Sequence, residues 1–78
     1  MELISRSSQI MICGDSYMEI ENCKRILEYN DVYLKVKTYK GLMIEIWGSD
    51  LMLSDYNTLG IAVRGKISSV EFSGRERE

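Results

Sequence analysis

Residues that enzymes use for nucleophilic chemistry are scarce in this sequence. It contains no histidine, the residue that most often activates a catalytic serine or cysteine. The two cysteines, Cys13 and Cys23, lie in apolar, strand-like surroundings and form no C-x-x-C pair that could begin a zinc site. We therefore expect both cysteines to remain reduced and to pack as small apolar side chains.

Acidic residues are more numerous, and paired carboxylates can act as general acid and general base. Here they alternate with apolar residues, which is the pattern of a solvated sheet face. No G-x-G-x-x-G or Walker sequence provides a phosphate-binding loop. The sequence therefore predicts a protein that is not an enzyme and that uses no metal, cofactor or small-molecule substrate. The acidic residues considered are Glu19, Glu21, Glu28, Glu45, Asp50 and Asp55.

The stretch YLKVKTYKGLMIEIWG, residues 33–48, alternates between two sets of side chains. One set is apolar and predicts an ordinary core-facing side. The other set contains tyrosine, methionine and the only tryptophan, which are enriched at the centres of protein interfaces. The alternative is intramolecular, with the chain's own amino-terminal strands covering part of this side. The residues that we expect at an interface are Tyr33, Met43, Trp47, Met52 and Tyr56.

The same stretch interleaves aromatic residues with lysines, and such a strand face can stack bases and hold phosphates. A small β-barrel that binds single-stranded nucleic acid is therefore the alternative function. Two observations weigh against it, because Glu45 is expected beside a lysine and the net charge of −2 provides no basic field. The residues concerned are Tyr33, Lys35, Lys37, Tyr39 and Lys40.

Apolar residues recur along most of the chain with a period of two, which predicts strands. Gly, Asn, Asp and Ser separate these strands, which recur about every eight to twelve residues, as in an all-β sandwich or barrel. We predict an all-β domain in which short antiparallel strands form a meander and curl into a sandwich or barrel, with a β-roll as the alternative. The eight expected strands are Gln9–Cys13, Tyr17–Asn22, Arg25–Tyr29, Val32–Thr38, Leu42–Trp47, Leu51–Tyr56, Ile61–Arg64 and Lys66–Phe72.

The loop before Leu42 fixes the expected pairing of two central strands. It has three residues and ends in Gly41, which suits a type I turn followed by a left-handed residue. This register places an aromatic pair and an opposite-charge pair on the same side of the sheet, where each stabilises it by up to about 1 kcal/mol. The expected pairs are Thr38 with Leu42, Tyr33 with Trp47, Lys35 with Glu45, and Lys37 with Met43.

The next loop, Gly48-Ser49, begins with glycine, which is typical of a type II′ hairpin turn. Such a turn would place Glu45 opposite Met52. Changes in the apolar alternation predict irregularities elsewhere in the sheet. They are a bulge near Arg25–Leu27 and either a bulge at Ser68-Ser69 or a corner at Gly65.

Length and charge limit the remaining possibilities. A chain of 78 residues makes one small domain, which buries only roughly 60% of its unfolded surface and gains stability from association. We therefore expect a homo-oligomer or a protein partner. Residues 1–13 contain no apolar run long enough for a signal peptide or a membrane span, which predicts a cytoplasmic protein. The expected organisation is a short lead-in, residues 1–8, a β domain, residues 9–73, and a charged tail, residues 74–78.

Several short motifs cover roughly residues 10–72. They are Ile20–Asp31, which reads IENCKRILEYND, then Gly41-x-x-x-x-Ile46-x-Gly48, Leu51-x-Leu53, and Gly65-Lys66-Ile67-x-Ser69-Val70-Glu71-Phe72. Together they resemble the YabP/YqfC family of sporulation proteins. The chain departs from the family in Cys23, where histidine or tyrosine is common, and in a shortened amino-terminal segment.

The resemblance implies a small non-enzymatic protein that is needed for endospore formation and that acts in assembly of the spore cortex and envelope. It also implies a membrane-associated partner protein and a place on the mother-cell side. No catalytic residues come with it. Among the shared positions, Gly41 and Gly48 are expected to form turns, and Asn22 to serve in a turn or in partner contact. The expected core positions are Leu27, Ile44, Ile46 and Leu53.

Overall fold

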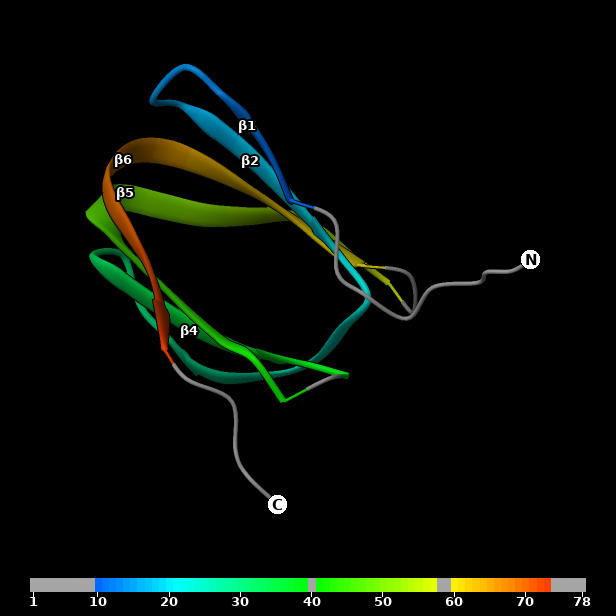
Figure 1. The fold of residues 1–78 in the computed structure, drawn as a ribbon. Coiled ribbons are helices and arrows are strands. Elements are labelled where there is room, and N and C mark those ends of the chain that lie inside the picture. The colour runs from blue at the N-terminus through cyan, green and yellow to red at the C-terminus, as the bar shows by residue number, and fades with distance from the viewer. Residues whose placement is uncertain (1–9, 40, 58–59, 74–78) are drawn as a thin grey trace.

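Six strands form a single antiparallel sheet in the computed structural model of the chain (Figure 1). The structure describes residues 10–39, 41–57 and 60–73, and of residues 55–57 it describes the backbone alone. The expected lead-in and charged tail lie outside these ranges. The strands are β1 (Ile10–Cys13), β2 (Tyr17–Glu21), β3 (Cys23–Tyr29), β4 (Tyr33–Thr38), β5 (Met43–Asn57) and β6 (Gly60–Ser73).

The strand order is β1-β2-β6-β5-β4-β3, and every neighbouring pair is antiparallel. The chain from β3 to β6 is a meander, as predicted. The hairpin of β1 and β2 then joins the far side of β6, so the predicted uninterrupted meander is wrong at this point. The join depends on backbone pairing between residues distant in sequence, which no turn specifies.

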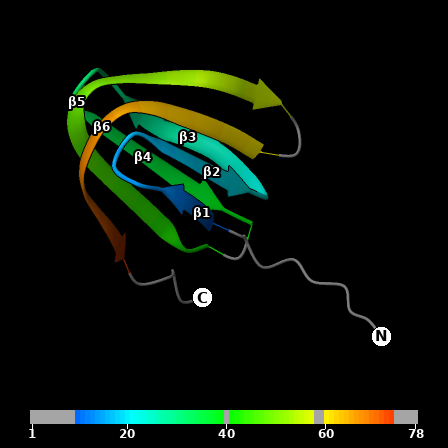
Figure 2. The ribbon, with the colours of Figure 1, turned by 90° about the horizontal axis from the view of Figure 1, so that it is seen from above.

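The two long strands, β5 and β6, bend sharply near their middles, and the bend divides the sheet into two halves (Figures 1 and 2). One half of the sheet contains β1, β2, the second part of β5 and the first part of β6. The other half contains β3, β4 and the remaining parts of β5 and β6, and the two halves face each other across the core. Among the described residues the sheet does not close, because β1 and β3 remain its two ends. The all-β prediction is confirmed, whereas closure into a sandwich or barrel is not.

The structure has six strands instead of the expected eight. The fifth and sixth expected strands form the single strand β5, because Gly48 and Ser49 continue the strand instead of reversing it. Trp47 faces Ser69 of β6, and Gly48 faces Ile67. The predicted type II′ turn is therefore wrong. The same bend joins the seventh and eighth expected strands into β6.

Close approach of two backbones explains why the bend contains glycine. A Cβ added to Gly48 would overlap the carbonyl oxygen of Lys66, and a Cβ added to Gly65 would overlap that of Asp50. Gly65 has a φ of 129° and Asp50 a φ of 55°, so both strands turn at the same level. The expected corner at Gly65 is confirmed, and so is the alternative bulge, because Ser68 is the extra residue between the pair of Trp47 with Ser69 and the pair of Gly48 with Ile67. Gly48 supports a bend rather than a hairpin turn.

The hairpin of β4 and β5 has the predicted register. Tyr33 pairs with Trp47 and Lys35 with Glu45. At the turn, Gly41 has a φ of 85°, and the backbone nitrogen of Thr38 donates to the Leu42 oxygen at 3.0 Å. The Leu42 nitrogen donates to the buried Thr38 hydroxyl at 3.1 Å. This hydrogen bond satisfies a polar atom that burial removes from water.

The core consists of inward-facing side chains from both halves of the sheet. Of the four positions that the resemblance implied, Ile44 and Ile46 are fully buried and Leu53 packs against the core. Leu27 is exposed, because a register shift between Ile26 and Glu28 leaves it as the extra residue of the predicted bulge. The fully buried hydrophobic residues in the described part of the chain are Met18, Ile20, Leu34, Val36, Ile44, Ile46, Leu51 and Val63.

Both cysteines are free, but only one of them packs as predicted. Cys23 is buried, and burial raises the pKa of its thiol, an effect that hydrogen bonding with the backbone of Arg25 partly offsets. Cys13 is exposed, because it faces outward on β1 at the end of the sheet. The predicted packing role of Cys13 is therefore wrong.

Candidate interaction surface

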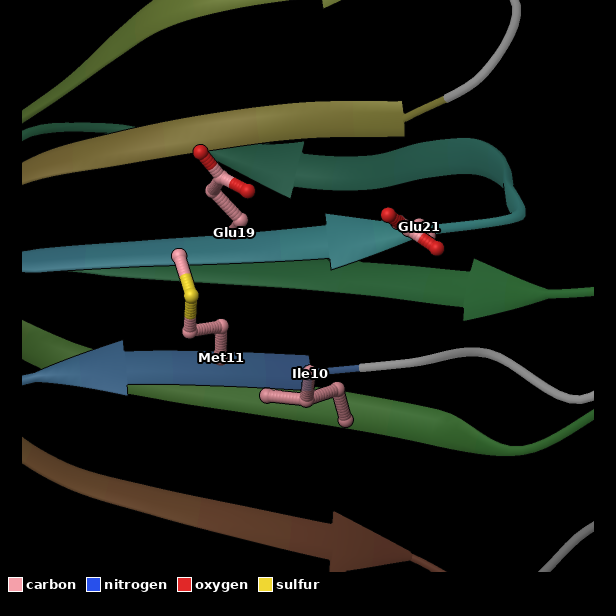
Figure 3. Close-up of a pocket in the computed structure, with 4 residues that line it drawn as sticks. All are labelled: Ile10, Met11, Glu19 and Glu21. Carbon is pink, nitrogen blue, oxygen red and sulfur yellow. The ribbon is translucent and has the colours of Figure 1, made fainter.

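An open depression lies on the outer surface of β1 and β2. Ile10, Met11, Glu19 and Glu21 line it (Figure 3). Glu19 already accepts a hydrogen bond from the Tyr17 hydroxyl at 2.6 Å. No group of three His, Cys, Asp or Glu residues in the described part of the chain is arranged to hold a metal ion. The depression therefore provides no catalytic or metal-binding constellation.

A second surface carries most of the residues that the sequence singled out. We call it the β4–β5 face, and it consists of outward-facing residues of β4 and the first half of β5. Every side chain in it is half-buried, whereas the alternate residues of both strands are buried in the core. Strict alternation of the strand therefore separates a core side from an ordered outer side. The face comprises Tyr33, Lys35, Lys37, Met43, Glu45 and Trp47.

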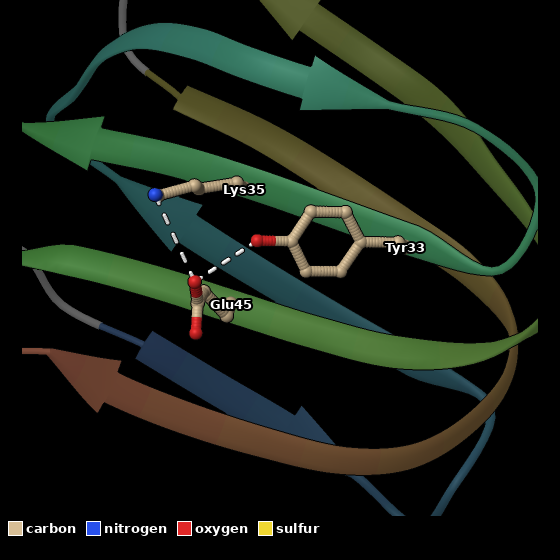
Figure 4. Close-up of polar contacts among 3 residues, drawn as sticks. All are labelled: Tyr33, Lys35 and Glu45. Atoms are coloured by element: carbon tan, nitrogen blue, oxygen red, sulfur yellow. Dashed lines mark hydrogen bonds and ion pairs between the residues drawn. The ribbon is translucent and has the colours of Figure 1, made fainter.

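The aromatic pair of this face is in direct contact. The ring centroids of Tyr33 and Trp47 are 5.3 Å apart, with planes inclined at 46°. The Tyr33 hydroxyl also donates to Oε2 of Glu45 at 2.9 Å (Figure 4). Tilted ring pairs at this separation stabilise by about 0.5–1.5 kcal/mol beyond the burial of their area. Tyr33 is thus fixed at both its ring and its hydroxyl.

Glu45 connects the tyrosine to a lysine. Its Oε2 lies 3.8 Å from Nζ of Lys35, and the two side chains are 19% and 33% exposed (Figure 4). A partly exposed ion pair of this kind stabilises by at most about 1 kcal/mol. Its larger effect is geometric, because a single carboxylate oxygen contacts both the phenol and the ammonium group.

The environment of Tyr33 also raises the pKa of its hydroxyl to about 12. Burial of the phenol contributes most, because it disfavours the charged phenolate. The hydrogen bond to Glu45 adds to the shift, followed by the negative charges of Glu45 and Glu28. At neutral pH Tyr33 therefore remains a hydrogen-bond donor.

Charges of both signs are mixed on the outer surface, where Arg25 pairs with Lys37 in one row and carboxylates dominate the next. Lys35 is flanked by Glu28 on β3 and by Glu45 on β5. Glu45 in turn faces Glu71 on β6. A nucleic-acid groove needs positive charge along its length, and here three carboxylates share a row with one lysine. This surface therefore favours a protein contact over a phosphate backbone.

The five expected interface residues do not all lie on one surface of the sheet. Tyr33, Met43 and Trp47 share the β4–β5 face, as predicted. Met52 pairs with Arg64 instead of Glu45, because it lies beyond the bend of β5, where it is 58% exposed. The backbone of Tyr56 pairs with Ile61 still farther along β5, and its side chain lies outside the described set.

Residues of the alternative nucleic-acid hypothesis are divided as well. Tyr33, Lys35 and Lys37 belong to the β4–β5 face, whereas Tyr39 is exposed at the end of the hairpin. Lys40 lies outside the described residues. Of the two tyrosines in this hypothesis, Tyr33 is packed on the face and Tyr39 lies outside it.

Comparison with models of known protein families confirms the resemblance noted in the sequence. The model of the YabP family matches residues 4–78. The chain belongs to the YabP family. This membership indicates a sporulation-related protein. No curated protein and no solved structure matches the chain.

One residue of the YabP-family motif has a role that the sequence analysis missed. The Tyr29 hydroxyl donates to the Leu51 oxygen at 3.3 Å and accepts from the Leu53 nitrogen at 3.2 Å. In this way Tyr29 of β3 occupies the edge of β5 where β4 has ended, and it ties the two halves of the sheet together. The position of Tyr29 in the L-E-Y segment of the motif was the feature of the sequence that could have pointed to this role.

Two further motif residues of this YabP-family chain have structural roles. Asn22 has a φ of 61° between β2 and β3, a left-handed conformation that asparagine tolerates, so the expected turn role is confirmed. Glu28 faces Lys35 on the outer surface. The described part of the chain contains no helix that is long and apolar enough to span a bilayer.

Proposed function

We propose that this protein is a non-enzymatic assembly factor for the spore envelope and cortex, and that its β4–β5 face binds a membrane-associated partner protein. The observation that carries the proposal is the packed pair of Tyr33 and Trp47, which Glu45 orders on an outward surface. Rigid aromatic side chains lose little conformational entropy on binding, which suits them to the centre of an interface. Family membership supports the link to sporulation.

Several parts of this proposal concern the cell rather than the chain. The partner places the protein at a membrane on the mother-cell side of the cytoplasm, and the protein also associates with copies of itself. Met52 and Tyr56, which follow the bend on β5, extend the contact if the partner reaches around the bend. The protein requires no cofactor in this role.

Substitution of Trp47 tests the proposal in sporulating cells. We expect Trp47→Ser to weaken partner binding about 30-fold, which corresponds to the ~2 kcal/mol of an interface hot spot. The protein should shift from the membrane fraction to the soluble fraction, and the yield of heat-resistant spores should fall. Tyr39→Ser is the matched control, because it removes an exposed aromatic residue outside the face.

A second variant separates lost binding from lost folding. Met43→Glu places a carboxylate beside Lys37, its neighbour in the sheet, so the strand pairing is retained while an apolar position of the face becomes charged. Circular dichroism should confirm that both variants fold. Membrane association and spore yield equal to the wild type in both variants would refute the proposed face. Binding to a single-stranded oligonucleotide that falls steeply with salt would instead support the nucleic-acid alternative.

A further inference from the structure

The two ends of the sheet differ in how they are protected. An unpaired edge strand invites pairing with another chain, and charged residues or bulges normally prevent this. β3 has both devices, because register shifts interrupt it at Lys24 and Leu27 and because it also carries Arg25 and Glu28. β1 reads IMIC, contains no charged residue, and pairs with β2 without any register shift.

The core is also less well covered beside β1. Ile12 pairs with the buried Met18 and therefore faces inward, yet it is 49% exposed. Phe72, near the end of β6, pairs with the buried Ile44 and is 52% exposed. β1 and the end of β6 belong to opposite halves of the folded sheet (Figure 1). Each half thus leaves an inward-facing apolar side chain in contact with water.

A hydrogen bond joins the turn between β1 and β2 to the middle of β6, which is the corner from which β1 and the end of β6 diverge (Figure 1). The turn between β1 and β2 joins β6 at the bend, where the Ile67 nitrogen donates to the Asp15 oxygen at 2.7 Å. From this corner β1 leads into one half of the sheet and the end of β6 into the other. At the opposite border, the hydrogen bonds of Tyr29 tie the halves together. Beside β1, no hydrogen bond between described residues ties the two halves together in this way.

We propose that β1 pairs with β1 of a second copy of this chain, antiparallel and about a two-fold axis. The sheet then continues from one copy into the other, and the second copy covers Ile12 and Phe72. This edge is distinct from the β4–β5 face, so one surface serves self-association and the other the membrane-associated partner.

A second copy is the occupant that the chemistry of this edge favours. In a two-fold antiparallel pair each residue of β1 faces another residue of β1. Because Ile10–Cys13 carry no charge, self-pairing places no like charges opposite each other. A short strand makes a small interface, so we expect a dissociation constant on the order of micromolar.

Sedimentation equilibrium on the full chain over a range of concentrations tests this proposal. We expect reversible formation of a dimer, and we expect Ile12→Lys to weaken it at least about tenfold, because an inward-pointing charge on an edge opposes pairing. Leu27→Lys is the matched control on the other end strand, where the bulge already prevents pairing, and it should dimerise as the wild type does. Trp47→Ser should also dimerise normally, so failure of this proposal and failure of the proposed function are distinguishable.

Amide hydrogen exchange on the unmodified chain gives a second readout that does not depend on any variant folding. Protection of the backbone amides of residues 10–13 should increase with protein concentration. A monomer at all concentrations, or a dimer that Ile12→Lys leaves intact, would overturn the proposal. Strong protection of β1 that is independent of concentration would overturn it too, because the chain itself would then cover the edge.

Discussion

Tyr33 makes two interactions at once, one through its ring and one through its hydroxyl. Its ring packs on Trp47, and its hydroxyl donates to Glu45, which also contacts Lys35. The four side chains therefore hold one another in place without reaching the core. A surface that is already ordered before binding loses less entropy when a partner arrives, which is why this cluster carries the proposed contact.

Ionisation of Tyr33 is expected to weaken the fold at high pH. The pKa is about 12 in the folded protein, whereas an unfolded tyrosine titrates near about 10. Because the folded value is raised, the stabilisation is complete below about pH 10 and is lost as the pH rises toward about 12. The absorbance of tyrosinate, compared between the wild type and Tyr33→Phe, reports this titration directly.

A variant of the neighbouring carboxylate checks the cause. Glu45→Gln removes a negative charge and should lower the pKa of Tyr33, although burial keeps it above the ordinary value. Glu71→Gln, which changes the carboxylate that faces Glu45 from β6, is the control and should have little effect. A Tyr33 that titrates near its ordinary pKa in the wild type would contradict the described environment.

At the scale of the elements, glycine serves in two different ways, Gly65 at the bend of β5 and β6 and Gly14 in the turn between β1 and β2. Gly65 has both a positive φ and a backbone neighbour, the Asp50 oxygen, at the position of a Cβ. Gly14 has a positive φ of 61° but no neighbour within 4 Å. We expect Gly14→Ala to cost about 1 kcal/mol of unfolding free energy and Gly65→Ala to cost about 3 kcal/mol or more. Urea unfolding of both variants measures the difference, and equal losses would show that the bend tolerates a side chain.

The elements that sequence reasoning predicted correctly are those fixed by local chemistry. The loop ending in Gly41 specified the register of β4 and β5, and with it the contacts of Tyr33 with Trp47 and of Lys35 with Glu45. The bulge at Leu27 followed from a visible break in alternation. These features depend on neighbouring residues, so one sequence is enough to predict them.

The features that were missed depend on strands that are distant in sequence. Gly48-Ser49 has the composition of a tight turn, and only the backbone of Lys66 on β6 shows that it is a bend instead. The predicted location of Met52 failed for this reason. The attachment of β2 to β6 and the hydrogen bonds of Tyr29 to β5 are likewise long-range contacts. No turn residue encodes them.

At the scale of the whole molecule, small size makes association matter for stability. A domain of this length is marginally stable alone, and pairing through β1 would add buried surface. We therefore expect the urea midpoint of the wild type to rise with protein concentration above the dissociation constant. Each tenfold increase corresponds to about 1.4 kcal/mol of unfolding free energy per mole of dimer. The midpoint of Ile12→Lys should stay constant. A wild-type midpoint that does not depend on concentration would show that the monomer is the stable unit.

The attachment of β2 to β6 has a consequence for synthesis of the protein. A ribosome releases the hairpin of β1 and β2 before the rest of the described sheet, yet the strand that this hairpin joins, residues 60–64 of β6, emerges after all the others. Until then Met18 and Ile20 have β1 on one side but no strand on the other, and the uncharged edge of β1 can meet other nascent chains on the same messenger. The described sheet is therefore completed only after β6 has emerged, and the hairpin is the segment that stays exposed in the interval.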